Sequence, residues 1–274
     1  MRRVRLGEDA FWTREAIADD LAALGLGAGD AVMVHASLRR VGAVLGGADG
    51  VIAALLDVVG PQGSILAYTS WDEQYEDALD DDGRLPADVK PHIPAFDPAA
   101  SRACRDHGAL AEAIRSTPGA QRSGNPGASV AALGARAEWF TADHPMNYGY
   151  GAGSPFARLV SAQGQVLMLG APWDTMSLLH HAEHLAQIPG KHVKRLEVPL
   201  AGPAGVIWRM IEEYDTSDPV MDGLHDDYFA DIVSDFLNSG QGRQGRVGDA
   251  PAVLVPAAAI TAFAVDWLEA RIQA

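Results

Sequence analysis

The feature that most constrains the fold is a strand–helix–strand pattern near the start of the chain. Residues 31–37 (AVMVHAS) and 63–70 (GSILAYTS) are short apolar runs typical of buried strands. Between them, residues 46–60 (GGADGVIAALLDVVG) have the apolar spacing of a helix that ends at Gly60. Two buried strands joined by a helix form a βαβ unit, and such units build parallel sheets that helices cover on both faces.

Later segments extend this pattern. A first helix is predicted from Thr13, its N-cap, and another after Ser154, with Pro155 in its first turn. Residues 199–215 contain turn residues and a strand-like middle that is also compatible with a helix. The other predicted elements are strands at 128–134 and 165–170 and a final helix at 260–272. We therefore predict an α/β fold with a mostly parallel buried sheet and helices on both faces, in a single domain spanning residues 1–274.

Composition narrows the class of protein. The chain has 274 residues, of which 48% are hydrophobic, enough for a sizeable core. Cys104 is the single cysteine, so the chain cannot form an internal disulfide or a cysteine-rich metal site, which favours a reducing compartment. The first residues lack the apolar segment of a signal peptide, and no run of 18 apolar residues occurs. These features predict a soluble, cytoplasmic protein with no membrane partner.

The charge is strongly negative and unevenly distributed. Asp and Glu number 36 against 21 Lys and Arg, a formal charge of -15 that disfavours binding to nucleic acid. Residues 72–88 hold eight carboxylates against one base, and residues 212–231 hold eight against none. Such stretches are usually solvated surface. The alternative is that they line a cleft that concentrates a polycationic ligand.

Polar residues follow three of the predicted strands. They lie in the sequences VHASLRR, YTSWDE and GAPWDTMSLLHHAEH, which begin at residues 34, 68 and 170. Ligands of open α/β sheets collect at the carboxyl ends of the strands. The three segments therefore predict one cleft.

The third segment leads into a helix that we predict over 175–187, with Asp174 as its N-cap. At 100° per residue the apolar side chains share one face, which would pack on the sheet: Leu178, Leu179, Ala182, Leu185 and Ala186. The residues capable of chemistry fall on the opposite side: Ser177, His180, Glu183 and His184. His181 lies at the boundary and is interpreted as a partly buried structural histidine.

Two kinds of chemistry fit that polar face. His180, Glu183 and His184 form the pattern H-x-x-E-H of the inverted zinc peptidases, with Glu212 or Glu213 available as a third ligand. The same residues also fit a metal-free acid/base pair, in which a carboxylate orients an imidazole that accepts a proton at neutral pH.

Longer motifs carry a resemblance to a known family. VMVHASLRRVG, ILAYTSW, FDP, RSGNP, GSPFARL, VLMLGAPWDTMSLLHHAE, GKHVKR and GRVGDA occur in this order, almost to the end of the chain. The sequence in this respect resembles the aminoglycoside 3-N-acetyltransferase family. The resemblance implies acetyl-coenzyme A as the acetyl donor and an aminocyclitol antibiotic as the acceptor. It also implies an α/β fold distinct from that of the common acetyltransferase superfamily.

The resemblance assigns roles to particular residues. It implies a catalytic site made of His180, Glu183, Asp174 and Ser177. The coenzyme-binding residues that it implies are His35, Ser37, Leu38, Arg39, Arg122 and Ser123. Two positions depart from the family pattern, because Asn125 replaces a common histidine and Ala36 replaces a common serine.

These observations predict an antibiotic-inactivating enzyme that transfers the acetyl group directly. His180 takes a proton from the 3-amino group, Glu183 or Asp174 orients the imidazole, and Ser177 with nearby N–H groups stabilises the oxyanion. Cys104 has no motif partner, so a covalent acetyl-enzyme is not expected. The residues expected to bind the aminoglycoside are Tyr68, Trp71, Asp72, Glu73 and Asp215. No metal is expected, and the chain is expected to be a monomer or homodimer.

Three other functions remain open from the sequence. The first is an acyltransferase of the same fold that acts on another amine. The second is a zinc-dependent hydrolase that uses His180, Glu183 and His184. The third is a non-catalytic protein that binds cationic ligands.

Overall fold

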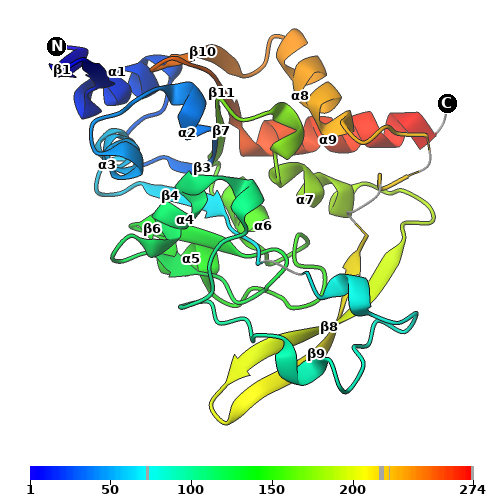
Figure 1. The fold of residues 1–274 in the computed structure, drawn as a ribbon. Helices are drawn as coiled ribbons and strands as arrows, with labels where there is room; N and C mark the ends of the chain where they lie inside the picture. Colours follow the sequence, from blue (N-terminus) through cyan, green and yellow to red (C-terminus); the bar gives the residue numbers. More distant parts are fainter. Residues whose placement is uncertain (72–73, 216–218, 222, 273–274) are drawn as a thin grey trace.

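A seven-stranded sheet forms the centre of the computed structural model, which describes residues 1–71, 74–215, 219–221 and 223–272 (Figure 1). Its strands, in spatial order, are β10 (Arg243–Val247), β11 (Ala250–Pro256), β7 (Gln165–Leu169), β3 (Ala31–Ala36), β4 (Ser64–Tyr68), β6 (Val130–Gly134) and β5 (Gln121–Arg122).

The predicted βαβ unit lies at the middle of this sheet. Strands β3 and β4 are parallel neighbours, and helix α3 (Gly47–Val59) connects them along the chain. Strand β7 pairs in parallel with β3 on its other side. Strands β11 and β6 run antiparallel to their inner neighbours, and β10 and β5 are antiparallel to these in turn. Five of the seven strands therefore point in one direction, which confirms the predicted mostly parallel sheet. The predicted strand at 128–134 is one of the two that run the other way.

Helices cover both faces of the sheet. One core packs α1 (Arg14–Leu24), α3 and α4 (Ala109–Ser116) against it. The other core takes helices α5 (Ala137–Thr141), α6 (Pro155–Ser161), α7 (Leu178–Leu185), α8 (Tyr228–Asn238) and α9 (Ala257–Ile272). A short helix, α2 (Leu38–Val41), follows β3 at the edge of the first layer.

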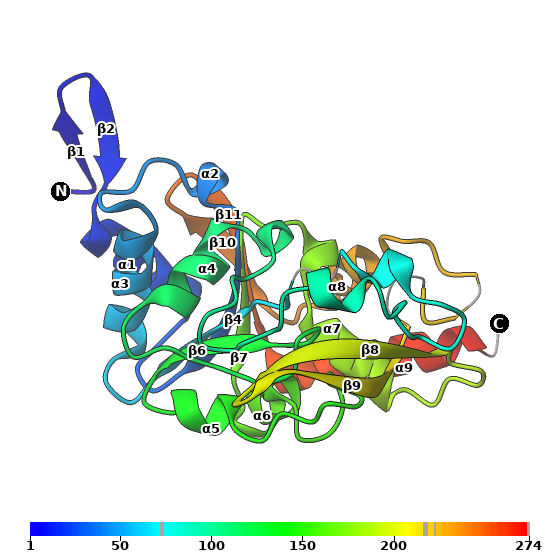
Figure 2. The same cartoon turned by 60° about the horizontal axis from the view of Figure 1, so that its bottom comes forward.

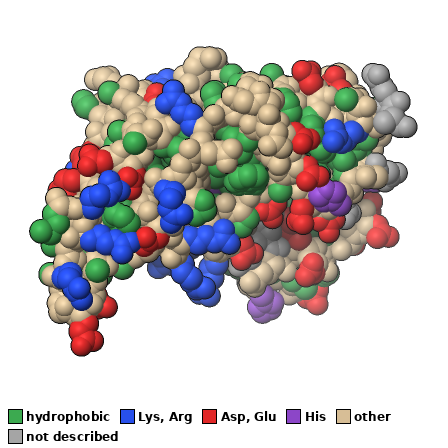
Figure 3. Space-filling view, turned by 90° about the horizontal axis from the view of Figure 1, so that it is seen from above, with side chains coloured by type: hydrophobic (Ala, Val, Ile, Leu, Met, Phe, Trp, Pro, Cys, Tyr) green, Lys and Arg blue, Asp and Glu red, His purple; other side chains and the backbone are tan. Residues whose placement is uncertain are grey.

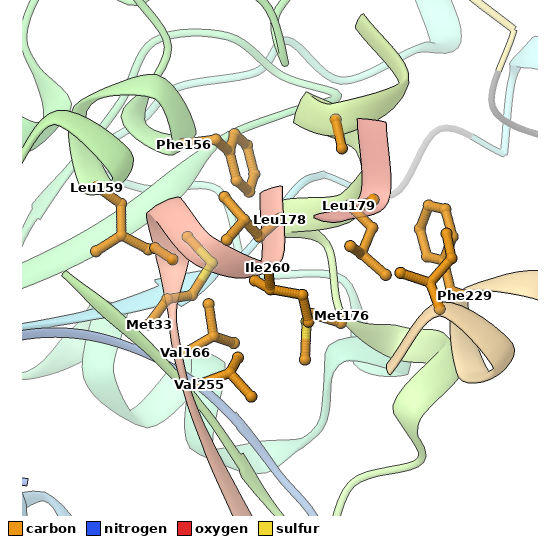
Figure 4. Close-up of a cluster of buried hydrophobic side chains, with 14 of the residues drawn as sticks. Met33, Phe156, Leu159, Val166, Met176, Leu178, Leu179, Phe229, Val255 and Ile260 are labelled. Atoms are coloured by element: carbon orange, nitrogen blue, oxygen red, sulfur yellow. The ribbon is translucent and has the colours of Figure 1, made fainter. Parts of the chain in front are cut away.

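Figure 4 shows how the second core holds helix α7. Met33, Val166 and Val255 project from β3, β7 and β11 towards Leu178 of α7 and Ile260 of α9. All five side chains are fully buried. Burying a large apolar side chain stabilises a fold by about 1.5–3 kcal/mol, so this contact fixes α7 firmly on the sheet.

The predicted helix starts are confirmed at two positions. Thr13 caps α1 by accepting a hydrogen bond from Ala16 N at 3.2 Å, and Ser154 caps α6 by accepting one from Ala157 N at 3.1 Å. Helix α1 ends at Gly25, whose φ of 112° is readily reached only by glycine. The final helix begins three residues earlier than predicted, at Ala257.

Two hairpins extend from this body. Residues 193–214 form an antiparallel pair, β8 (Val193–Gly202) and β9 (Gly205–Tyr214), which we call the arm. The ambiguous segment of the sequence is therefore a strand. The arm has a small core of its own, and Figure 2 shows it lying across one end of the molecule. The second hairpin, β1 (Arg3–Leu6) with β2 (Asp9–Trp12), projects at the N-terminus and was not predicted.

The described residues also include the 3₁₀ turns η1 (Glu76–Ala78), η2 (Lys90–His92), η3 (Arg105–His107) and η4 (Trp173–Thr175). Among the helices that the structure describes, none has the length and apolar character needed to cross a membrane. The division into one domain stays a prediction.

Candidate active site

The three predicted strand ends do meet in one cleft. Its volume is about 600 Å³. The residues that line it come from the ends of β3 and β4, from the segments after β3 and β7, and from the start of helices α4 and α7: His35, Ala36, Ser37, Leu38, Arg39, Tyr68, Asp106, His107, Gly108, Ala109, Ala171, Pro172, Asp174, Thr175, Ser177 and His180.

A hydrogen-bonded chain of three side chains reaches the cleft from helix α7. The Nδ1 atom of His180 lies 2.7 Å from Glu183 Oε2, and the Tyr228 hydroxyl donates to Glu183 Oε1. Glu183 is only 2% exposed. Since a carboxylate accepts hydrogen bonds, Glu183 fixes the proton of His180 on Nδ1 and leaves the lone pair on Nε2. Burial and the neighbouring Glu183 raise the pKa of Tyr228, which keeps its hydroxyl a donor.

The start of α7 differs from the prediction. The helix begins at Leu178 with Ser177 at its N-cap, and Asp174 lies in the preceding turn, η4. Pro172 leads into this turn, and the fully buried Met176 directs the chain inward before the helix starts. Asp174 is therefore not the cap. It lines the cleft, and the carboxylate hydrogen-bonded to His180 is that of Glu183.

Ser177 has the position expected of a group that contacts a ligand. It is 3% exposed and lines the cleft. Its hydroxyl oxygen is buried and has no hydrogen-bond partner among the residues that the structure describes. A buried hydroxyl usually has a partner, so a ligand atom in the cleft would satisfy it.

The rest of the polar face of α7 is covered by other parts of the protein. The Nδ1 atom of His181 is 2.6 Å from the carbonyl oxygen of Tyr150, and burial lowers the pKa of His181, which supports its structural interpretation. His184 Nε2 lies 3.0 Å from Glu213 Oε1 on the arm. Leu185, placed on the packing face by the helical pattern, is 45% exposed because α7 ends there.

This arrangement does not favour the zinc site. His180 and His184 face different carboxylates, Glu183 and Glu213. Within the described part of the chain, no group of three or more His, Cys, Asp or Glu side chains could hold a metal ion.

Four of the predicted coenzyme-binding residues border the cleft. Ser37, Leu38 and Arg39 lie at the start of α2, directly after β3. His35 precedes them, and its buried Nε2 has no protein partner within the described residues. Burial lowers the pKa of His35 to about 3, so its ring is neutral near pH 7.

The other two, Arg122 and Ser123, do not line the cleft. Arg122 donates hydrogen bonds to the carbonyl oxygens of Ser70 and Ser101, and burial lowers its pKa to about 10. Ser123 is fully buried and accepts a hydrogen bond from Val130 N at 2.9 Å. The side chains of both residues are hydrogen-bonded to the protein backbone, so their contacts do not support the predicted coenzyme binding.

A second, inner cavity of about 180 Å³ adjoins the cleft through Tyr68, which lines both. The Tyr68 hydroxyl lies 2.6 Å from that of Tyr150, and the ring of Tyr150 packs 4.8 Å from that of His180. The inner cavity is lined by Tyr68, Ser70, Trp71, Glu76, Asn125, Gly127, Ala128, Tyr150, Lys194, Leu196, Ile211 and Glu213.

The predicted aminoglycoside-binding residues distribute unevenly around this cavity. Tyr68 and Trp71 line it. Asp72 and Glu73 lie outside the described residues. Asp215 is not among its lining residues, and Glu213, two positions earlier, takes that place.

Acidic side chains continue from the inner cavity to the surface. Glu76 lines both the inner cavity and an open hollow of about 800 Å³ that also contains Asp80, Asp81 and Asp82. Its Oε2 atom accepts a hydrogen bond from Lys194 at 3.0 Å. Its Oε1 atom is buried without a partner in the described part of the chain. Glu76 therefore retains an acceptor for an ammonium group.

Sequence reasoning missed the wall formed by residues 106–109. His107 and Gly108 immediately precede helix α4, and both line the cleft. The sequence does show a histidine followed by a glycine at a helix start. That local pattern does not indicate which part of the fold the histidine faces.

Comparison with known proteins agrees with this geometry. The profile of a family described as aminoglycoside 3-N-acetyltransferase matches residues 33–269. The chain belongs to that family. It is 45% identical over 262 residues to an aminoglycoside N(3)-acetyltransferase III of Pseudomonas aeruginosa, with 94% of each chain covered.

Solved structures extend the similarity to the fold. A structure described as AAC-IIIb in a binary complex with CoASH has 65% identity and a TM-score of 0.94, covering 95% of this chain and 97% of the other. A structure of AAC-VIa bound to sisomicin has 38% identity and a TM-score of 0.90, covering 96% and 100%. The predicted family and α/β fold class are confirmed, and the chain is an acyltransferase.

Proposed function

We propose that the enzyme transfers the acetyl group of acetyl-coenzyme A to the 3-amino group of an aminoglycoside antibiotic and so inactivates it. The observation that carries this proposal is the His180–Glu183 pair, whose histidine lines the cleft and packs on Tyr150 of an inner cavity that contains Glu76 and Glu213. Family membership and the ligands named for the two similar structures, CoASH and sisomicin, support the same substrates.

The two ends of the site suit ligands of opposite charge. The donor carries phosphates, and the cleft ends at α2, where Arg39 and Arg40 are exposed. The acceptor is a polycation, and the inner cavity leads to Glu76 and the acidic hollow. In Figure 3, Lys and Arg side chains gather over the N-terminal side of one face, and Asp and Glu predominate on the other side.

In this mechanism, the chain's residues move one proton. Nε2 of His180 takes the proton from the 3-amino group as its nitrogen attacks the thioester carbon. Glu183 stabilises the imidazolium through Nδ1–H, and the Ser177 hydroxyl donates to the oxyanion. Collapse breaks the C–S bond, and the coenzyme A thiolate takes the proton from His180. The step requires no covalent enzyme intermediate and no metal.

The first test is acetyl transfer itself, followed by release of free coenzyme A thiol and by the mass of the acetylated drug. Purified enzyme should acetylate at least one 3-amino aminoglycoside and leave an analogue without the 3-amino group unmodified. His180→Ala should lower kcat by ~10²–10⁴-fold with its fold intact, since that is the usual contribution of a general base. His92→Ala, at an exposed histidine, is the control. Wild-type turnover in His180→Ala would remove His180 from the mechanism.

A further inference from the structure

His107, which the sequence did not single out, lines the same cleft as His180 and Ser177. It ends turn η3, and Gly108 follows with a φ of 81° as the chain enters α4. A Cβ atom at Gly108 would lie 3.1 Å from the carbonyl oxygen of Ala36, so this turn packs closely against the end of β3. His107 is thereby fixed in the same cleft as His180.

Two neighbours hold the ring of His107 in one orientation. Its Nε2 atom lies 2.6 Å from Ser70 Oγ, and its ring packs 4.3 Å from the ring of Tyr68. Tyr68 lines both the cleft and the inner cavity, and Ser70 lines the inner cavity. His107 therefore lies where the cleft adjoins the inner cavity. The acetyl donor and the aminoglycoside would meet there.

The partner serine is itself held in an unusual backbone conformation. Ser70 has a φ of 29°, in a region that residues other than glycine rarely adopt. Its N–H donates to Ser129 O at 3.1 Å, and its carbonyl oxygen accepts a hydrogen bond from Arg122. Strained residues persist where their surroundings fix them, and they concentrate at functional sites. Here the fixed backbone aims the serine hydroxyl at His107.

His107 is suited to a different chemical role from that of His180. Burial lowers the pKa of His107 to about 4, with a smaller contribution from Arg122 and His180, although Asp106 opposes the shift. The ring is therefore neutral near pH 7 and carries one N–H donor and one acceptor. Unlike His180, it has no carboxylate hydrogen-bonded to it among the described residues.

The hydrogen bond to Ser70 fits either tautomer of His107, because a hydroxyl can donate to Nε2 or accept from it. When the Ser70 hydroxyl donates to Nε2, the proton of the ring lies on Nδ1. No group in the described part of the chain is hydrogen-bonded to Nδ1, so this N–H is available to a ligand in the cleft. A neutral imidazole used as a hydrogen-bond donor to a carbonyl oxygen is an established catalytic device.

We propose that Nδ1–H of His107 donates a hydrogen bond to the carbonyl oxygen of the acetyl thioester and stabilises the oxyanion beside Ser177. This inference rests on the proposed acetyl transfer. As the C–N bond forms, the carbonyl π electrons move to oxygen, and the oxyanion receives the hydrogen bond. When the C–S bond breaks, the C=O bond re-forms and coenzyme A leaves with the proton held by His180. His107 keeps its own proton throughout.

The test compares three variants of the full-length enzyme: His107→Ala, His107→Asn and His107→Gln. We expect His107→Ala to lower kcat by ~10²–10³-fold, the usual loss for one oxyanion donor. Asparagine places an amide nitrogen near the position of Nδ1 and should restore part of kcat. Glutamine places its nitrogen near Nε2 and should restore less. Binding of coenzyme A, measured by titration, should change by less than about threefold.

Three results would overturn the proposal. The first is a kcat for His107→Ala within about threefold of wild type. The second is a loss of kcat in that variant that follows a loss of coenzyme A binding. The third is a change in its pH profile of kcat/KM, which would make His107 a base. If the alanine variant does not fold, equal kcat values for the asparagine and glutamine variants decide against it. Absence of acetyl transfer by the wild type would instead contradict the proposed function.

Discussion

At the residue scale, Tyr228 is the side chain that completes the His180–Glu183 pair. Tyr228→Phe should lower kcat by roughly tenfold or more, because a hydrogen bond to a charged group contributes about 1.5–3 kcal/mol. The variant keeps the ring, which packs 4.8 Å from Phe229, so the fold should be retained. Steady-state kinetics and a thermal melt measure the two effects.

Tyr148→Phe is the matched control for that substitution. Tyr148 also directs its hydroxyl to a glutamate, Glu212 Oε2 at 3.4 Å, but on the arm and outside the catalytic chain. Its kcat should stay near the wild-type value. Equal losses of kcat in the two variants would show that Tyr228 has no special role in holding Glu183.

The residues of the site divide into those that the sequence could reveal and those that it could not. The sequence could reveal the residues of one helix and a family motif, because helical spacing alone places Ser177, His180 and Glu183 together. Tyr228 and His107 reach the same place from segments 45 residues after Glu183 and 37 residues after Ser70. No local periodicity encodes such contacts, because they depend on how distant elements pack.

At the scale of elements, two helix caps of the same chemistry should differ in their effect on activity. Thr13→Ala and Ser154→Ala each remove a hydroxyl that accepts a backbone N–H, which costs about 0.5–2 kcal/mol of stability. Ser154 also donates to the carbonyl oxygen of Tyr150 at 3.3 Å, and Tyr150 packs on His180. We therefore expect only Ser154→Ala to lower kcat/KM.

Chemical unfolding and steady-state kinetics on both cap variants check this expectation. Thr13 serves as the control because it lies at the start of α1, on the other face of the sheet from α6. An unchanged kcat/KM in Ser154→Ala, together with a clear loss of stability, would show that the position of Tyr150 does not depend on this cap.

The elements themselves were predictable where hydrophobic pattern and burial agree. The βαβ unit and both caps follow from apolar runs bounded by glycine, threonine or serine. The N-terminal hairpin was missed because each of its strands has only four residues and is mostly exposed, so its pattern is too short to indicate a strand. The arm remained ambiguous because β9 has mostly exposed or half-buried residues, and its pairing partner, not its pattern, makes it a strand.

At the scale of the whole molecule, buried histidines should make stability fall as the pH decreases. Burial lowers the pKa of His35 to about 3 and those of His107 and His144 to about 4, from an ordinary value of 6.5. Between roughly pH 6.5 and 4 the unfolded chain binds protons that the folded chain does not. The free energy of unfolding, measured by denaturant titration, should therefore be greatest above this window and decline through it.

Removing one of these histidines isolates their contribution. His107→Asn should make the decline with pH shallower, because one fewer group takes up a proton on unfolding. His92→Asn, at an exposed position, should leave the slope unchanged. A slope for His107→Asn identical to that of the wild type would mean that other groups control acid stability.

The distribution of charge over the molecule should govern acceptor binding. Exposed ion pairs contribute only about 0–1 kcal/mol each and weaken with salt, but a polycation meets several carboxylates at once. We therefore expect KM for the aminoglycoside to rise steeply with ionic strength, without a parallel rise in KM for acetyl-coenzyme A. A KM for the aminoglycoside that does not change with salt would show that the acidic stretches are solvated surface only.

Glu76 is the residue that connects this field to the inner cavity, because it lines both the cavity and the acidic hollow and has one buried oxygen without a described partner. Glu76→Gln should raise KM for the aminoglycoside severalfold and flatten its dependence on salt, while kcat changes little. Asp226→Asn removes the same charge from an exposed site just before α8, which lies far from the arm in Figure 1, and should alter neither quantity. Equal changes in KM in the two variants would show that only net charge matters, and the specific role of Glu76 would be excluded.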